Sequence, residues 1–176
     1  MQKIIFKILR TFPPEISHNI TLKLLSLKLH NKKILNDPIL HQHIFGFDFS
    51  NPLGMAAGFD KNVEVIKPLF NLGFGFVEAG TVTPKPQYGN DKPRIFRLTD
   101  DLAIINHLGF NNKGSQYAEK KLKKLNLNSL SEGIVGINIG KNEESQDYIN
   151  DYNYCLEKLG PHAHYVAINI SSPNTP

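Results

Sequence analysis

The stretch Ile134-Val135-Gly136-Ile137-Asn138-Ile139 decides the fold. It is short, rich in β-branched residues and almost wholly apolar, which is typical of a strand buried on both faces of a parallel sheet. Tyr165-Val166-Ala167-Ile168-Asn169-Ile170 has the same character and follows after one stretch of helical spacing. The two stretches therefore predict neighbouring strands with a helix between them.

The same alternation of strand and helix extends toward the N-terminus. Strands are expected at 53–58, 74–80, 134–139 and 165–170, and helices at 63–70, 117–125 and 148–159. This order fits either a doubly wound sheet or a (β/α)8 barrel. Neither G-x-G-x-x-G nor G-x-x-x-x-G-K-[ST] occurs, so no nucleotide fingerprint favours the open sheet. We predict an α/β fold of the (β/α)8 TIM barrel type, truncated after about the fourth strand, because a whole barrel needs about 250 residues.

Residues 1–40 differ from the rest and are predicted to form an N-terminal amphipathic helical extension, ahead of the first half of the barrel at 41–176. Helices are expected over 2–10 and from Pro14 onward. Residues 1–35 contain seven lysine or arginine residues and one glutamate, whereas the whole chain has a net charge of +4. A wide apolar face with basic residues beside it suits an anionic membrane surface or an apolar partner. The alternative is a helix that covers the protein's own core.

The composition excludes several classes of protein. The single cysteine, Cys155, rules out an internal disulfide framework, and no stretch is long and apolar enough for a transmembrane helix. Basic residues concentrated at one end indicate a docking surface, so no nucleic-acid partner is expected. The pairs His41 with His43 and His162 with His164 lack a third ligand, so no metal site is expected.

The asparagines inside the two quoted strands are the strongest chemical signal. Asparagine is depleted in strands, and burying an unpaired amide costs about 1–3 kcal/mol. Period-two alternation sends the flanking isoleucines toward the helices and points Asn138 and Asn169 into the barrel. There each amide offers an acceptor and two donors to a ring edge with C=O and N–H groups, such as a pyrimidine or a flavin. The alternative is a structural pair of amides bonded to each other or to nearby backbone.

Polar residues follow each strand, at the end where barrel enzymes place their chemistry. Lys61 follows the first strand and could neutralise a carboxylate or the charge of a reduced flavin, although a solvated surface lysine is the alternative. A small hairpin or lead-in strand is expected at 43–49, and a long polar loop from Thr83 to about Asn111, where function often resides. Ser172 follows the fourth strand without a neighbouring histidine, so spacing alone favours a turn former over a nucleophile.

Six motifs in chain order resemble the dihydroorotate dehydrogenases, from about residue 44 to the end. They are 51–61 (NPLGMAAGFDK), 80–84 (GTVTP), 89–94 with 96–97 (GNDKPR and FR), 109–112 (GFNN), 136–141 (GINIGK) and 169–176 (NISSPNTP). This family is a flavin-dependent barrel that oxidises dihydroorotate to orotate in pyrimidine (UMP) biosynthesis. The resemblance implies that fold, the cofactor FMN, and dihydroorotate and orotate as ligands.

The resemblance also implies the residues of the site. Contacts with FMN are implied for Ala57, Gly58, Phe59, Asp60, Lys61, Thr81, Asn138 and Asn169. Contacts with dihydroorotate are implied for Lys61, Asn106, His107, Leu108, Gly109, Phe110, Asn169 and Asn174. Ser172 is implied as the base that removes a ring proton alpha to a carbonyl while a hydride passes to the flavin. His107 is a departure, because the family usually has an arginine at this position.

Two features resemble the membrane-associated, quinone-reducing class of the family. Ser172 stands where the soluble class has a cysteine, and the N-terminal helices resemble an extension that forms a quinone path, with His18 and Arg97 beside it. This implies a quinone as final electron acceptor and a peripheral location on the cytoplasmic side of the cell membrane. The alternatives are a soluble-class enzyme and a non-catalytic half-barrel that binds a membrane or partner. Barrel phosphate sites usually follow strands seven and eight, so we expect the 176-residue chain alone to be inactive and to lose FMN.

Overall fold

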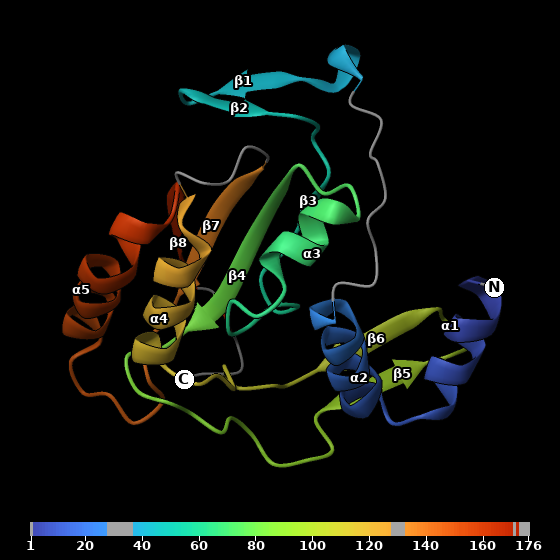
Figure 1. The fold of residues 1–176 in the computed structure, drawn as a ribbon. Coiled ribbons are helices and arrows are strands. Elements are labelled where there is room, and N and C mark those ends of the chain that lie inside the picture. Colours follow the sequence, from blue (N-terminus) through green and yellow to red (C-terminus); the bar gives the residue numbers. More distant parts are fainter. Residues whose placement is uncertain (1, 28–36, 128–132, 171, 173–176) are drawn as a thin grey trace.

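A four-stranded parallel sheet lies at the centre of the molecule (Figure 1). The structure is a computed structural model, and it describes residues 2–27, 37–127, 133–170 and 172. The strands are β3 (Gly54–Met55), β4 (Phe76–Val82), β7 (Ile134–Ile139) and β8 (Tyr165–Ile168). They stand side by side in their order along the chain. Successive strands are neighbours in this way in a barrel, whereas in a doubly wound sheet the order in which strands are added reverses at a switch point.

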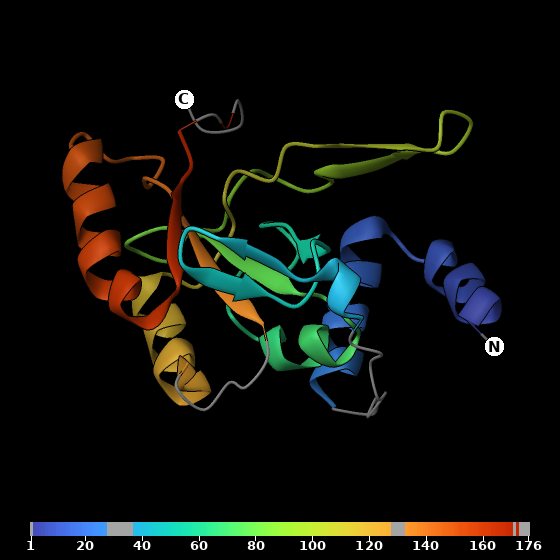
Figure 2. The same cartoon turned by 90° about the horizontal axis from the view of Figure 1, so that it is seen from above.

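Helices α3 (Ile66–Asn71), α4 (Ser115–Leu125) and α5 (Tyr148–Leu159) lie along one side of the sheet (Figure 2). The hydrophobic core fills the space between this side and the helices. It is formed by one row of side chains from the strands and by the inner faces of the helices: Val77, Ala79, Val135, Ile137, Ile139, Leu69, Leu122, Cys155 and Leu159. The two isoleucines beside Asn138 therefore face the helix layer, as the period of the strand predicted.

A small hairpin, one of the two forms expected for residues 43–49, covers one end of the sheet. It consists of β1 (Gln42–Ile44) and β2 (Phe47–Phe49). The ring centroids of Phe49 and Phe76 lie 5.6 Å apart, and those of Phe47 and His164 lie 5.7 Å apart, both edge to face. Phe76 begins β4 and His164 precedes β8, so the hairpin lies where the strands begin. The opposite end, where the strands finish, is left for the loops.

The N-terminal region forms helices α1 (Gln2–Thr11) and α2 (Pro14–Ser26), and the short 3-10 helix η1 (Pro38–Leu40) follows. The helical conformation is interrupted between α1 and α2 at Pro13, because proline lacks the backbone N–H that a continuing helix would use. Helix α2 packs against β5 and α3. In the part of the chain that the structure describes, no helix has the length and apolar character needed to cross a bilayer. The boundary at residue 40 between two domains stays a prediction.

The prediction of one long loop from Thr83 to Asn111 was wrong. An antiparallel hairpin interrupts it, formed by β5 (Ile95–Leu98) and β6 (Ala103–Asn106). Both strands contain β-branched or aromatic residues, which favour strands. Among the strands that the structure describes, β5 and β6 pair only with each other, and their burial is too shallow to impose the clean alternation by which strands are recognised.

Two strands are shorter than predicted. The first was expected at 53–58, but β3 ends at Met55 because the following residues enter a tight turn. The Asp60 carboxylate holds that turn by accepting hydrogen bonds from the backbone N–H groups of Asn62, Glu64 and Val65. The last strand was expected at 165–170, and β8 ends at Ile168. A short 3-10 helix, η3 (Gly160–His162), leads into it.

Candidate functional site

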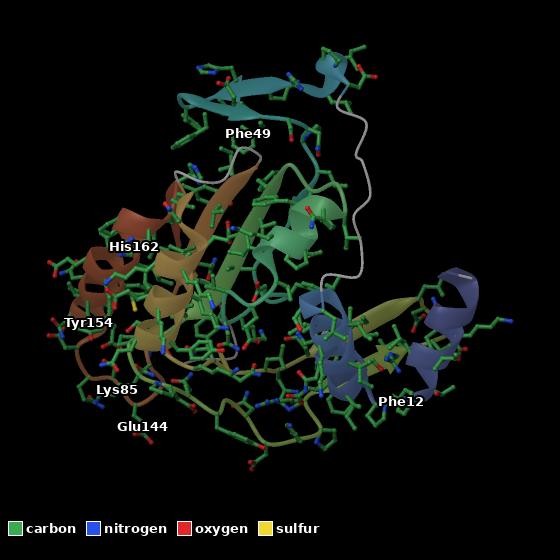
Figure 3. The ribbon with its side chains drawn as sticks, in the orientation of Figure 1. Phe12, Phe49, Lys85, Glu144, Tyr154 and His162 are labelled. Carbon is green, nitrogen blue, oxygen red and sulfur yellow. The ribbon has the colours of Figure 1, made fainter. Side chains whose placement is uncertain are left out.

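The predicted site residues gather at the end of the sheet where the strands finish. Figure 3 labels Lys85 and Glu144, in the loops that follow β4 and β7, at the end opposite to Phe49 of the hairpin. In the described ranges, no three His, Cys, Asp or Glu side chains group in a way that could hold a metal ion. Amides, hydroxyls and charged side chains, Lys61 and Lys113 among them, line this region instead.

The side chains of Thr81, Asn138 and Asn169 form one hydrogen-bonded cluster across three strand ends, which we call the amide cluster. Thr81 Oγ1 donates to Asn138 Oδ1 at 2.6 Å. Asn169 Nδ2 lies 3.2 Å from Thr81 Oγ1 and 3.3 Å from Asn138 Oδ1 and donates to both. The amides thus bond each other, which was the structural alternative for them. These bonds do not use all the hydrogen-bonding capacity of the two side chains, because each amide has two donor hydrogens and two acceptor lone pairs.

Glu78 and Tyr165 extend the amide cluster along the face of the sheet that is turned away from the helices. Asn138 Nδ2 donates to Glu78 Oε1 at 2.9 Å, and the Tyr165 hydroxyl donates to Glu78 Oε2 at 3.1 Å. The Tyr165 side chain crosses over Gly136 of β7 to contact Glu78. Gly136 leaves room for it, because a Cβ at this position would lie 2.2 Å from Tyr165 Cζ. The pKa of Tyr165 is raised, first by burial and then by the charge and hydrogen bond of Glu78.

The turn after β3 brings Ala57, Gly58, Phe59 and Lys61 beside β4. The Gly58 N–H donates to the Gly80 carbonyl at 2.7 Å, and the Gly80 N–H donates to the Asp60 carbonyl at 2.9 Å. Gly80 directly precedes Thr81, so this turn adjoins the amide cluster. The fully buried Asp60 carboxylate is occupied by backbone donors of the turn. The structure thus gives Asp60 a role in shaping the turn, and its contact with FMN stays a prediction.

Lys61 lines a cavity of about 180 Å³ together with His18, Gly58, Leu108 and Asn111. Residues predicted for the cofactor, the substrate and the quinone path therefore meet at one cavity. The pKa of Lys61 is lowered to about 8, mainly by burial and next by the charge of Arg94, while Glu15 opposes the shift. Lys61 is therefore not the solvated surface lysine of the alternative interpretation. A half-buried, partly desolvated cation of this kind favours an anionic ligand.

The two residues predicted beside the quinone path have different surroundings. The His18 ring stands edge to face with Phe59 at 5.2 Å. Burial and then the charge of Lys61 lower the pKa of His18, so its neutral form is favoured. Arg97, in β5, instead holds the turn between α1 and α2: its Nη1 donates to the carbonyls of Arg10 and Phe12, and its Nη2 to Ser17 Oγ.

The loop predicted to hold dihydroorotate is partly ordered by contacts with the strand ends. Phe110 packs against Gly140, where a Cβ would lie 2.9 Å from its ring and 2.8 Å from Thr81 Cγ2. His107 stacks on Phe96 with 5.7 Å between ring centroids. Asn106 is exposed, Leu108 is half-buried and Gly109 is buried. This places Phe110 next to the amide cluster and leaves Asn106 at the surface.

The remaining predicted residues lie after β8. Ser172 is half-buried, and Asn174 lies outside the described residues. Their roles as base and substrate contact stay predictions.

Two groups in this region were not predicted as functional from the sequence. Glu78 lies inside a strand of mostly small and apolar residues, which is the same signal that marked Asn138 and Asn169. Arg94 is 3% exposed and donates to both carboxylate oxygens of Glu15, at 3.2 and 2.6 Å. Nothing in the local pattern announces that ion pair, because its partners are far apart in the chain.

Comparison with known proteins decides the family. A family model described as dihydroorotate dehydrogenase matches residues 39–176. The chain belongs to the dihydroorotate dehydrogenase family. Dihydroorotate dehydrogenase (quinone) of Rhodospirillum rubrum is 49% identical over 164 residues, covering 93% of this chain and 44% of that protein. The relative of the same name from Novosphingobium aromaticivorans is 48% identical over 179 residues, covering 100% of this chain and 50% of its own length.

Solved structures of the dihydroorotate dehydrogenase family agree with the fold described above. The crystal structure of DHODH from Eimeria tenella in complex with ferulenol matches with a TM-score of 0.88 and 42% identity, over 98% of this chain and 48% of that one. The ligand-free Eimeria tenella structure matches with a TM-score of 0.86 and 43% identity. The predicted barrel fold is thereby confirmed. The chain spans about half the length of the dihydroorotate dehydrogenases that it matches.

Proposed function

We propose that this chain forms the half-barrel of an enzyme that oxidises dihydroorotate to orotate, with FMN as hydride acceptor and a quinone as final electron acceptor. The observation that carries the proposal is the amide cluster at the ends of parallel strands, next to the cavity of Lys61, in a chain of this family. The relatives are named for a quinone, which favours the quinone-dependent class over the soluble class.

The residues present fit a flat, polar heterocycle such as the ring of FMN. A Cβ built on Gly58 would meet only Lys61 Nζ, at 3.9 Å, so a ring has open space above this backbone. The φ of Gly58 is +100°, a conformation that residues with side chains rarely adopt. The oxygen Oδ1 of Asn111, which also lines the cavity, is buried without a hydrogen-bond partner among the described residues. A buried polar atom of this kind needs a partner.

The chain supplies positioning and charge for the reaction. Thr81, Asn138 and Asn169 would hold the flavin ring, and Lys61 and Asn169 would bind the substrate, whose carboxylate suits a buried cation. Ser172 would accept the proton lost from the substrate carbon. FMN, when bound, accepts the hydride. Because a serine is a weak base, a further proton acceptor must take the proton from Ser172.

Ser172→Ala tests the proposed reaction in the complete gene product that contains this chain. Anaerobic mixing with dihydroorotate is expected to reduce the flavin of the wild type, and the variant is expected to reduce it about 10²–10⁴-fold more slowly. Bleaching of the flavin absorbance is the measurement. Ser26→Ala, at an exposed position of α2, is the matched control. A wild-type protein without flavin, or one whose flavin dihydroorotate does not bleach, would refute the proposed function.

His18 is proposed to line the route of the quinone. Its half-buried ring shares the cavity with Lys61, and its neutral form suits an uncharged quinone. His18→Ala is expected to raise the KM for a short-chain ubiquinone and to leave the rate of flavin reduction by dihydroorotate unchanged. Equal effects on both half-reactions would argue against a quinone route at this cavity.

The N-terminal helices are proposed to attach the protein to the cytoplasmic side of the cell membrane. Ile8, Phe12, Ile16, Leu24 and Leu27 expose large apolar side chains on α1 and α2 and at their ends. The basic residues nearby would add attraction to anionic lipids. Co-sedimentation with anionic vesicles is expected, and it should weaken with salt. Equal binding to neutral vesicles would argue against a role of the basic residues, and no binding to either kind of vesicle would argue for the soluble class.

A further inference from the structure

Glu78 controls which way the side chain of Asn138 can point. Both oxygens of Glu78 accept hydrogen bonds, Oε1 from Asn138 Nδ2 and Oε2 from the Tyr165 hydroxyl. A carboxylate offers acceptors only, so the NH₂ end of Asn138 must face it. The Oδ1 end of Asn138 is then fixed on the other side, where Thr81 and Asn169 donate to it.

The orientation of the Asn138 amide also fixes the orientation of the Asn169 amide. Since Asn138 Oδ1 accepts, Asn169 must turn its NH₂ group toward Asn138 and Thr81, at 3.3 and 3.2 Å. The Oδ1 of Asn169 is thereby turned away from the cluster, as an acceptor for a ligand. Without Glu78, both amides could rotate by half a turn and present the opposite pattern, because the two ends of an amide have nearly the same shape.

We propose that Glu78 is a positioning residue, which sets the donor and acceptor pattern that Asn138 and Asn169 offer to the flavin and the substrate. The proposal rests on the proposed function. Tyr165 supports it by occupying the second oxygen of Glu78, and Gly136 supports it by leaving room for the Tyr165 ring. A charged residue placed inside a strand serves the fold poorly, because an apolar residue of similar volume is often neutral or better for stability.

A double-mutant cycle in the complete gene product tests the proposal. The FMN is removed, and the apoprotein is titrated with FMN while the quenching of flavin fluorescence is followed. Glu78→Met and Asn138→Ala are each expected to raise the Kd for FMN about tenfold or more, the effect of losing a hydrogen bond to a charged group or its partner. If Glu78 acts through Asn138, the double variant binds FMN as weakly as the worse single variant, within about twofold.

Glu78→Gln distinguishes positioning from charge. Glutamine removes the charge and can still turn its oxygen toward Asn138 Nδ2, the orientation that is favoured while Thr81 and Asn169 donate to Asn138 Oδ1. The Kd for FMN is therefore expected to stay within about threefold of the wild type. A loss as large as that of Glu78→Met would overturn positioning by hydrogen bonds. If the fold-increases in the Kd for FMN of the two single variants multiply in the double variant, Glu78 does not act through Asn138. That result would overturn this proposal and leave the proposed function intact. An unchanged Kd in Asn138→Ala would overturn the flavin position itself, and this proposal with it.

Tyr165→Phe keeps the proposal testable if Glu78→Met does not fold, as judged by circular dichroism and urea unfolding. The phenylalanine ring fills the same space above Gly136 but leaves Glu78 Oε2 without its donor. A smaller rise in the Kd for FMN is expected, and it should vanish when Asn138 is already alanine. A rise that persists in the Asn138→Ala background would show that Tyr165 and Glu78 act by another route.

Discussion

Lys61 is a half-buried cation that the free protein holds at an energetic cost. Its folded pKa is about 8 against 10.5 for an ordinary lysine, mainly because of burial. The folded state therefore binds fewer protons than the unfolded chain between about pH 8 and 10.5. Stability attributable to Lys61 should rise with pH through this window, and the full penalty is present below it.

Lys61→Met is expected to stabilise the ligand-free protein while weakening ligand binding. We expect a gain of about 1–3 kcal/mol in the free energy of unfolding at pH 7, since one pKa unit corresponds to about 1.4 kcal/mol. Urea unfolding at pH 7 and pH 10 measures it, and the gain should shrink at the higher pH. Lys67→Met, at an exposed position, should change stability by less than about 0.5 kcal/mol. Equal gains at both pH values would contradict the burial of a charge.

Gly136 allows Tyr165 to cross the sheet. Gly136→Ala places a Cβ about 2.2 Å from Tyr165 Cζ, so the ring must move and the bond to Glu78 is expected to break. We expect a loss of about 1–3 kcal/mol in the free energy of unfolding. Gly160→Ala is the matched control, since its nearest neighbour would lie at 3.5 Å. A tolerated Gly136→Ala would show that the Tyr165 ring is not confined.

At the scale of residues, the sequence predicted one part of the site and not its support. Asn138 and Asn169 were recognisable because asparagine is depleted in strands and each stands between two isoleucines. Glu78 carries the same signal, yet it lies near small residues and a glycine that weaken the strand pattern. Which oxygen meets which amide depends on the register of three strands, and no local pattern encodes that.

At the scale of elements, the pair Glu15 and Arg94 joins α2 to the segment before β5. The Arg94 guanidinium also donates hydrogen bonds to the backbone carbonyls of Tyr88 and Asn90, within its own segment of the chain. The hydrogen bond from Arg94 holds the pKa of Glu15 below its ordinary value. A depressed carboxylate pKa gives stability that is present above the unfolded value of 4.5 and is lost as the pH falls through the folded value.

Glu15→Gln is expected to lower the free energy of unfolding by about 2–4 kcal/mol at pH 7, because it leaves a buried guanidinium without its counter-charge. The difference from the wild type should shrink at a second pH well below 4.5, because protonation of Glu15 removes the charge that pairs with Arg94. Urea unfolding at the two pH values is the measurement. Glu157→Gln, on the exposed side of α5, is the control. A loss that is independent of pH would refute the role of the charge.

The helices and parallel strands were largely predictable, because burial imposes a regular pattern on them. α5 and β7 match their predicted ranges. The hairpin of β5 and β6 was missed for the opposite reason: Leu98, Ile104 and Ile105 remain exposed, so inside and outside positions look alike in the sequence. The turn that shortens β3 was missed because it depends on a side chain, Asp60, bonding to backbone that follows it.

At the scale of the whole molecule, an apolar cavity of about 550 Å³ opens beneath the β1–β2 hairpin, and Ile44, Phe47 and Phe76 line it. Phe45, at the hairpin turn, is 96% exposed. Apolar surfaces of this kind promote association. We therefore expect the 176-residue polypeptide, expressed alone, to self-associate with rising concentration. Light scattering after size exclusion measures it.

Ile44→Ser combined with Phe45→Ser is expected to reduce this self-association. Tyr148→Ser, which removes an exposed ring from α5, away from the hairpin, is the control. A polypeptide that stays monomeric at every concentration tested would contradict the expectation, as would an equal effect of the control.

The grip of Arg97 on the turn between α1 and α2 has an evolutionary consequence. Two of the three acceptors are main-chain oxygens, those of Arg10 and Phe12, so the side chains at these positions are irrelevant to the bond. The side chains at positions 10 and 12 can therefore change without loss of these two hydrogen bonds. Arg97 has no such freedom, because its three hydrogen bonds come from two separate guanidinium nitrogens and a lysine has only one side-chain nitrogen.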